Sequence, residues 1–157
     1  PSPEEFEKNN LKIIYLGWFL GDWSLINNGI YSCLNGIEIK DDGPENGDLH
    51  GLSALDEDWV PVNQMIKYYK FGFGKITDYV NEEIRLGRLK RTEGIDIIEQ
   101  FDGKCQKKYI NSFCQYIGIN EKEFWDQINI NINKSLFFID EKGSIHKKFK
   151  VGLGLNQ

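Results

Sequence analysis

Features that would place a protein in a membrane, outside the cell or on nucleic acid are absent from this sequence. No apolar run approaches the roughly 20 residues that a helix needs to cross a bilayer, and the Pro-Ser-Pro-Glu-Glu start lacks the regions of a signal peptide. Acidic residues outnumber basic ones by 24 to 19, and the formal net charge of -5 argues against a nucleic-acid surface. We therefore expect a cytoplasmic protein with no membrane span and no nucleic-acid partner.

Metal ligands and catalytic nucleophiles are also scarce. The three cysteines, Cys33, Cys105 and Cys114, are odd in number and far apart, which is typical of a reducing compartment and not of a metal site. The two histidines, His50 and His146, lie in a predicted loop and a predicted hairpin, and no serine stands in a nucleophile elbow. We expect no metal site and no self-contained catalysis.

The 157 residues, 40% of them hydrophobic, suffice for one domain with a core. We expect a polar, frayed leading segment over 1–10 and a single domain over 11–157. Within that domain, the apolar run 11–20 predicts a buried strand. Because ligands in open α/β sheets lie just beyond the strand ends, Asp22 and Trp23 are candidate site residues. The alternative is a buried tryptophan with a capping aspartate.

A turn-rich stretch follows over 27–52, with an alternating part over 33–39 that is either a short strand or a helix end. Loops of this length are often lids or binding loops, and otherwise mobile connections. The acidic residues of this loop are explained more readily by a solvated loop than by a metal site, because no second histidine sits at ligand spacing. The residues concerned are Asp41, Asp42, Glu45, Asp48 and His50.

Helical spacing of apolar residues begins near residue 60 and predicts about five short helices. Pro61 suits the first turn of the first helix. Thr77 or Asp78 is the expected cap of the second, which Gly87 ends, and Thr92 is the expected cap of the third.

Residues 106–117 form the cleanest amphipathic helix, and Asn120 with Glu123 forms a capping box that opens the next. Where that helix ends is open, because residues 128–133 alternate as a strand would. The tail predicts a β-hairpin around residues 140–143. The predicted fold class is α+β and mainly helical, with one buried strand, about five short helices and a C-terminal hairpin.

The motif KFGFGK, residues 70–75, joins the first two predicted helices. Its glycines, Gly72 and Gly74, permit close backbone approach, and its lysines, Lys70 and Lys75, suit phosphate or carboxylate. Polar residues line one face of the helix on each side. This arrangement predicts a small polar site, unless both faces are merely solvated and the glycines only end a helix.

The stretch from Phe71 to Gly103 resembles the C-terminal part of the N-acetyl sugar amidotransferases, which make acetamidino sugars for lipopolysaccharide O-antigen and related glycans. The elements that carry the resemblance are FG-x-G-(R/K)-x-TD, IR-x-GR, a threonine-acidic helix start and a closing DG. They stand in the family's order, and the similarity covers most of residues 11–140.

The resemblance implies an ATP-dependent reaction in which the N-acetyl oxygen is adenylated and then replaced by ammonia from a glutaminase subunit. That family's S-G-G-x-D-S pyrophosphate loop is missing here. ATP with Mg would then bind mainly to an N-terminal pyrophosphate-loop half of an α/β enzyme, and this chain alone would be inactive. The implied substrate is an acidic or nucleotide-linked N-acetyl sugar.

Residue type and spacing suggest the roles within such a site. Lys70 and Lys75 would contact an anion, Gly72 and Gly74 would allow close approach, and Arg85 would grip a carboxylate or phosphate beside an acidic neighbour. The binding candidates are Lys70, Gly72, Gly74, Lys75, Thr77, Asp78, Glu82, Arg85, Asp22 and Trp23.

Two other functions fit the same pattern of short helices. In the first, the chain is a non-catalytic module that docks a partner or forms a dimer, and KFGFGK is a plain turn between helices. A helix-turn-helix over 92–132 is disfavoured by the acidic balance.

Overall fold

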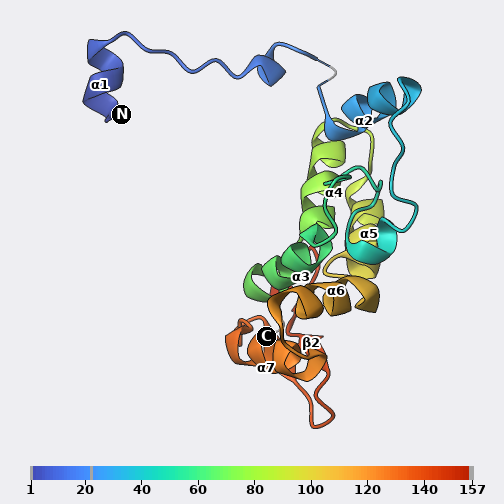
Figure 1. Cartoon of the computed structure of the whole chain (residues 1–157). Coiled ribbons are helices and arrows are strands. Elements are labelled where there is room, and N and C mark those ends of the chain that lie inside the picture. The colour runs from blue at the N-terminus through green and yellow to red at the C-terminus, as the bar shows by residue number, and fades with distance from the viewer. Residues whose placement is uncertain (1, 22, 156–157) are drawn as a thin grey trace. The chain divides into compact units, whose positions relative to one another are not determined.

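The computed structural model describes residues 2–21 and 23–155, apart from the side chain of Trp18. The chain forms two compact units, Pro1–Gly36 and Ile37–Gln157, and each is described by itself (Figure 1). The predicted division into a segment over 1–10 and one domain over 11–157 stays a prediction.

The first unit contains two helices and a single 3-10 turn among its described residues: α1 (Pro3–Lys8), η1 (Leu16–Trp18) and α2 (Leu25–Leu34). The Ser24 hydroxyl caps α2 by accepting a hydrogen bond from the backbone N–H of Asn27 at 3.1 Å. Because α2 ends at Leu34, the alternating stretch over 33–39 begins as a helix end and continues without a strand.

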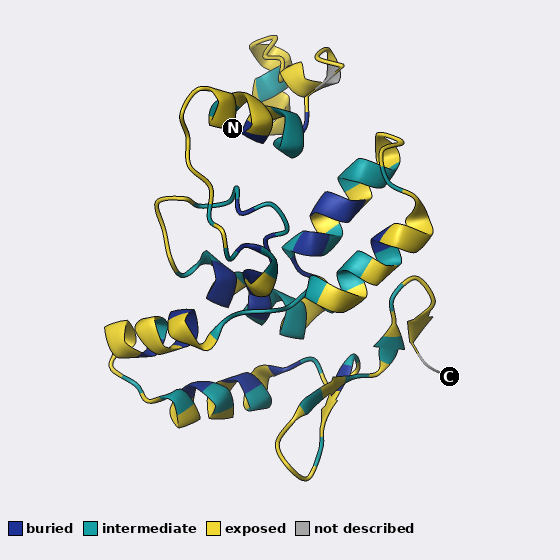
Figure 2. Ribbon diagram, turned by 90° about the vertical axis from the view of Figure 1, so that its right-hand side faces the viewer, coloured by how far each residue is buried: buried dark blue, intermediate teal, exposed yellow. Residues whose placement is uncertain are grey.

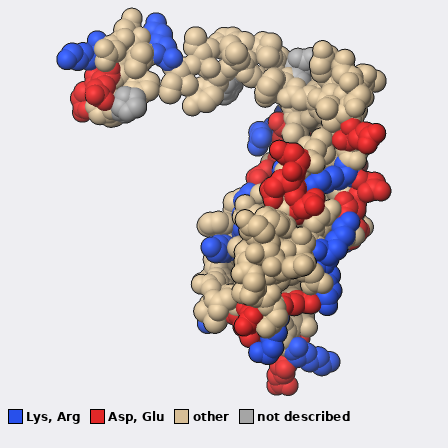
Figure 3. Space-filling view, viewed as in Figure 1, with Lys and Arg blue, Asp and Glu red and all other residues tan. Residues whose placement is uncertain are grey.

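The predicted buried strand over 11–20 is wrong. Its described side chains are exposed, with Ile14 at 65% and Phe19 at 77%, and the described surface between α1 and α2 carries few charged side chains (Figure 3). A buried strand needs a neighbouring strand for its backbone hydrogen bonds, and no strand is found among the described residues of this unit. The apolar run thus has the composition of a strand without a sheet to join.

The second unit is mainly helical with two small antiparallel hairpins. Its helices are η2 (Pro44–Asn46), α3 (Val60–Phe71), α4 (Lys75–Arg85), α5 (Arg91–Phe101), α6 (Lys107–Ile117) and α7 (Glu121–Asn131). Its strands are β1 (Phe137–Ile139), β2 (Ile145–Lys147), β3 (Phe149–Lys150) and β4 (Gly154–Leu155). The strand β1 pairs with β2 and β3 with β4. The predicted α+β, mainly helical class is confirmed at this level, and so is the hairpin around residues 140–143.

Local capping explains where these helices begin. Pro61 lies in the first turn of α3, as expected. The capping box of Asn120 and Glu123 opens α7. This helix takes in the first part of the alternating stretch 128–133 and ends at Asn131. Thr92 is not a cap, because α5 starts one residue earlier at Arg91.

The core of the second unit lies between α3, α6 and α7. Buried positions form a stripe along one side of each helix (Figure 2), as amphipathic spacing requires. The fully buried members of this cluster are Val62, Met65, Tyr109, Ile110, Cys114, Phe124 and Ile128. The first hairpin adds Phe137, which is 2% exposed and lies edge-on to Tyr68 and Tyr69 of α3.

Helices α4 and α5 pack closely because Gly94 has no side chain. A Cβ atom at Gly94 would lie 2.6 Å from Cγ1 of Val80 and 3.1 Å from Cδ1 of Ile84, both on α4. The close pair places the start of α4 beside the end of α5, which shapes the site described next.

Candidate functional site

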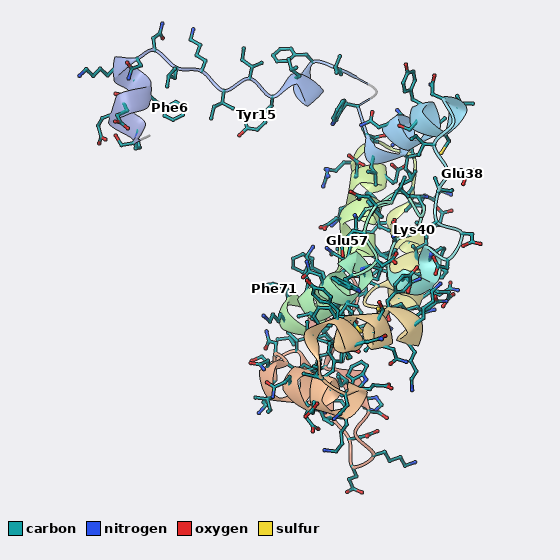
Figure 4. The ribbon with its side chains drawn as sticks, in the orientation of Figure 1. Phe6, Tyr15, Glu38, Lys40, Glu57 and Phe71 are labelled. Atoms are coloured by element: carbon teal, nitrogen blue, oxygen red, sulfur yellow. The ribbon has the colours of Figure 1, made fainter. Side chains whose placement is uncertain are left out.

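The loop over residues 37–59 is fixed against the helices by long-range hydrogen bonds. Within the loop, the Lys40 ammonium donates to the carbonyl oxygens of Ala54 at 2.9 Å and Glu57 at 2.8 Å (Figure 4). The hydroxyl of Tyr109 on α6 donates to Oδ2 of Asp42 in the loop at 3.0 Å. Farther along, the backbone N–H of Gln106 donates to Oδ1 of Asn46 at 2.8 Å. This loop is therefore an ordered wall that packs against α3, α4 and α6.

A small polar pocket lies between this loop and the helices. Asp48 enters it from the loop, Gln64 from α3, Lys75 from α4 and Tyr109 from α6. Asp48 is only 8% exposed, and its Oδ2 accepts a hydrogen bond from the backbone N–H of Ser53 at 2.8 Å. We call this the loop pocket.

Lys75 is half-buried in the loop pocket. Its ammonium lies 5.6 Å from the centroid of the Tyr79 ring, within the range of a cation–π contact. Burial lowers the pKa of Lys75, while the carboxylates of Asp48 and Asp78 act in the opposite direction. Lys75 is thus a cation beside a buried carboxylate.

Two further groups lie next to the pocket and are held in their neutral forms. Burial raises the pKa of Tyr79, whose hydroxyl shares a hydrogen bond with the hydroxyl of Ser53. The His50 ring lies 5.8 Å from the Tyr79 ring between centroids, and burial lowers the pKa of His50 against the effect of Asp48 and Glu83. At neutral pH these groups offer hydrogen bonds, not charge.

The glycine motif has a different role from the one its pattern suggests. The backbone N–H of Gly74 donates to Oδ2 of Asp102 at 2.8 Å, and the hydroxyl of Thr77 donates to the same oxygen at 2.7 Å. Burial raises the pKa of Asp102, and these two bonds oppose that rise. A helix N-terminus binds anions, and here the chain's own carboxylate occupies the N-terminus of α4.

Neither Thr77 nor Asp78 is the N-cap of α4, which begins at Lys75 after Gly74. Asp78 instead pairs with Lys67 at 2.9 Å, and the Lys67 ammonium lies 4.7 Å from the centroid of the Phe73 ring. The polar faces of the two helices therefore meet through this one ion pair.

The remaining predicted residues do not converge on one site. Gly72 and Thr77 line a groove between α4, α5 and the second hairpin, away from the loop pocket. Lys70 and Arg85 are exposed at the ends of their helices, and Glu82 is partly buried. Of the predicted residues that the structure describes, Lys75 alone lines the loop pocket.

Two candidates belong to the first unit. Trp23 is 57% exposed, so the alternative of a buried tryptophan is wrong. Asp22 lies outside the residues that the structure describes.

Sequence reasoning missed the residues that surround Lys75. Gln64 carries no motif that marks a site, and Tyr79 stands at the spacing of a buried core position on its helix. Asp48 and His50 were noticed only as members of an acidic loop. In the described part of the chain, no group of three or more His, Cys, Asp or Glu side chains is placed to hold a metal ion. No described helix combines the length and hydrophobicity that a membrane crossing requires.

Comparison with known families decides the affiliation. The model of the family "LPS biosynthesis protein WbpG-like, C-terminal domain" matches residues 52–150, well over half of the chain. The chain belongs to this family. No curated protein matches the sequence.

The match confirms the predicted resemblance to the C-terminal portion of an amidotransferase-like family of lipopolysaccharide biosynthesis. The WbpG-like C-terminal domain spans α3 to β3 and includes the glycine motif, Lys75, Tyr79 and Asp102. Asp48 and His50 lie just before the matched range.

Proposed function

We propose that this chain is the C-terminal part of a cytoplasmic, ATP-dependent amidotransferase that converts an N-acetyl group of a sugar into an acetamidino group. The observation that carries the proposal is the match to the WbpG-like C-terminal domain over residues 52–150. The product would enter lipopolysaccharide O-antigen or a related glycan.

The proposed reaction balances with ATP and ammonia as co-substrates. The N-acetyl oxygen attacks the α-phosphorus of ATP and releases pyrophosphate; ammonia then adds to the activated carbon, and AMP departs with the oxygen. A glutaminase partner supplies the ammonia. Such chemistry depends on holding the sugar in place more than on a strong base.

The described residues of this chain do not fit a site for ATP with Mg. The N-terminus of α4, where the glycine motif suggested a phosphate site, is occupied by Asp102. The described residues also lack a carboxylate cluster suited to a metal. We therefore assign the nucleotide and its metal to an N-terminal pyrophosphate-loop half, and sugar positioning to this chain.

Reconstitution tests this function. The chain is mixed with the N-terminal half of a WbpG-like enzyme, ATP, Mg, ammonium chloride and a UDP-linked N-acetyl sugar. We expect AMP, pyrophosphate and a sugar in which NH replaces oxygen, detected by mass spectrometry, only when both halves are present. Failure to form the amidino sugar with both halves folded and associated would exclude the proposed reaction.

Charge reversal distinguishes a substrate site from docking. Lys75→Glu puts a second carboxylate beside Asp48 and should abolish turnover while the two halves still associate on a sizing column. Lys75→Met is the matched control for folding, and circular dichroism checks both variants. Lys70→Glu, at an exposed position, tests the second predicted lysine in the same assay.

A docking or dimerisation module is the second candidate, and the exposed apolar side chains of residues 11–20 favour it. Contiguous exposed apolar surface commonly marks an interaction site. In this case the N-terminal half would bind the chain, and neither lysine variant would alter turnover by the assembled enzyme.

A further inference from the structure

The groove between α4, α5 and the second hairpin has room for a small molecule. Its cavity volume of about 250 Å³ is close to the lower end of the range of roughly 300–1,000 Å³ for small-molecule sites. The loop pocket, at about 20 Å³, has room only for water. The larger cavity is lined by residues from the ranges 72–84, 91–98 and 149–154, and we call it the hairpin groove. Most of this lining falls within the range 52–150 that the family model matches.

The walls of the hairpin groove are mainly apolar. Ile84 of α4, Ile95 and Ile98 of α5 and Phe149 of β3 are among the residues that line it, and all four are partly buried. Their remaining apolar surface faces water until a ligand covers it, and covering it is favourable. A ligand of this groove therefore has an apolar part, such as a methyl group or the C–H face of a ring.

Two cations belong to the same groove. Arg91 and Lys150 are among its lining residues, which include no Asp or Glu, and both are exposed. Within the described chain, the Arg91 guanidinium makes one long hydrogen bond, to the carbonyl oxygen of Gly152 at 3.4 Å, and neither cation forms an ion pair with a carboxylate. A guanidinium and an ammonium with free donors suit a carboxylate or a phosphate. The charge of the groove therefore fits an anionic ligand.

A neutral polar group completes the lining. Asn81 reaches the groove from α4 at an exposed position, and within the described chain its side chain forms no hydrogen bond. A side-chain amide both donates and accepts, so it matches a hydroxyl or an acetamido group. The groove thus offers an anion contact, a hydrogen-bond partner and an apolar wall within the space of one sugar ring.

We propose that the hairpin groove binds an anionic N-acetyl sugar. Arg91 and Lys150 hold its carboxylate or phosphate, Asn81 bonds to a hydroxyl or the acetamido group, and the apolar walls pack against the acetyl methyl group and the ring. The inference rests on the proposed function for the choice of a sugar among anions with an apolar part. Lys75 does not line this groove, so its charge reversal and the test below are independent.

Amide NMR of the whole ¹⁵N-labelled chain tests the proposal with four probes. N-acetylglucosamine 1-phosphate and N-acetylneuraminic acid each combine an N-acetyl group with an anion. N-acetylglucosamine lacks the anion, and glucose 1-phosphate lacks the acetyl group. We expect an anionic N-acetyl sugar to shift the amide signals of Asn81, Ile95 and Gly152 in a saturable manner. N-acetylglucosamine should bind about tenfold more weakly, and glucose 1-phosphate about fourfold more weakly.

Each result of this comparison has a definite meaning. Shifts from only one of the two anionic N-acetyl sugars would identify the anion as a phosphate or as a carboxylate. Equal affinity for glucose 1-phosphate and N-acetylglucosamine 1-phosphate would make the groove an anion site that ignores the acetyl group. Equal affinity for neutral N-acetylglucosamine would remove the cations from the site. Either equality, or the absence of saturable shifts with all four probes, overturns the proposal.

Substitutions assign the anion contacts. Arg91→Gln and Lys150→Gln each remove one charge and should weaken binding of whichever anionic N-acetyl sugar binds the parent by about tenfold. Lys142→Gln, at an exposed position in the turn of the first hairpin, is the matched control and should leave the affinity unchanged. Circular dichroism checks the fold of all three variants. If both groove variants fold and bind the sugar as the parent does, the assignment is wrong.

The two hypotheses fail separately. Sugar-dependent shifts in the groove, without an amidino product from the reconstituted enzyme, would contradict the proposed reaction and leave the sugar site intact. An amidino product with an unchanged KM for the sugar in both Arg91→Gln and Lys150→Gln would contradict the sugar site alone.

Discussion

The Asp102 carboxylate decides how the glycine motif is used. It lies at the end of α5, yet it accepts hydrogen bonds from the backbone of Gly74 and the side chain of Thr77 at the start of α4. Gly74 is required there, because a Cβ atom would lie 2.5 Å from Oδ1 of Asp102. Thr77 of the Thr-Asp element and Asp102 of the Asp-Gly element are thus hydrogen-bond partners within this chain.

We predict that Asp102→Ala lowers the free energy of unfolding by about 1–3 kcal/mol, because it leaves buried donors of Gly74 and Thr77 without an acceptor. Asp102→Asn keeps one acceptor oxygen and should cost less. Thr77→Val, which removes one of the two donors, is the matched comparison. Urea denaturation measures all three variants, and equal stability of Asp102→Ala and the parent would contradict the capping role.

His50 makes stability depend on pH. Its pKa is lowered from 6.5, mainly by burial, so the unfolded chain binds a proton more readily than the folded one. By linkage, stability that is present above about pH 6.5 is lost as the pH falls through the folded pKa.

His50→Gln should therefore reduce the fall in the urea midpoint between pH 7 and pH 5. His146→Gln, in the exposed hairpin beside Asp140, controls for the loss of a histidine. A His50→Gln variant with the pH profile of the parent would show that burial of this ring does not couple to folding.

At the scale of elements, the pairing of α4 with α5 depends on Gly94. Alanine is the better helix former by about 1 kcal/mol, but its methyl group would collide with the stiff, β-branched Val80. Overpacking of this kind costs typically about 1–3 kcal/mol. The steric effect should outweigh the helix propensity.

We predict that Gly94→Ala lowers the thermal midpoint of the chain. Val80→Ala in the same chain opens space for the new methyl group, so the double variant should lose less stability than the sum of the two single changes. A double-mutant cycle in urea measures this coupling, and strict additivity would exclude the predicted collision.

At the scale of the whole molecule, the exposed run over 11–20 is the clearest unexplained surface. Side chains such as Ile14 and Phe19 contribute little burial in the described chain, so polar substitutions there should change the free energy of unfolding by less than about 0.5 kcal/mol. If this run binds the N-terminal half, the same substitutions weaken that association.

The measurement compares the parent with Ile14→Lys and Phe19→Lys, using calorimetric unfolding for stability and a sizing column for association with the N-terminal half. Glu4→Lys, also exposed in the same unit, controls for the added charge. Unchanged association for both apolar variants would remove this run from the interface.

The sequence alone determined the elements whose causes are local. Apolar spacing and capping residues predicted the positions of α6 and α7, and Pro61 predicted the start of α3. The turn residues at 140–143 predicted the first hairpin. These features depend on interactions within a few residues, which a linear pattern contains. The family resemblance was likewise available from the order of short motifs.

Only the tertiary structure decided what depends on distant partners. The run 11–20 lacked a sheet to join, Asp102 reached back 28 residues to Gly74, and the loop over 37–59 brought Asp48 to Lys75. Burial by distant segments also sets the pKa shifts of His50 and Tyr79. Such contacts depend on how helices pack and not on local spacing. The sequence therefore offered Lys75 as a candidate, which stays a prediction, and did not indicate which residues surround it.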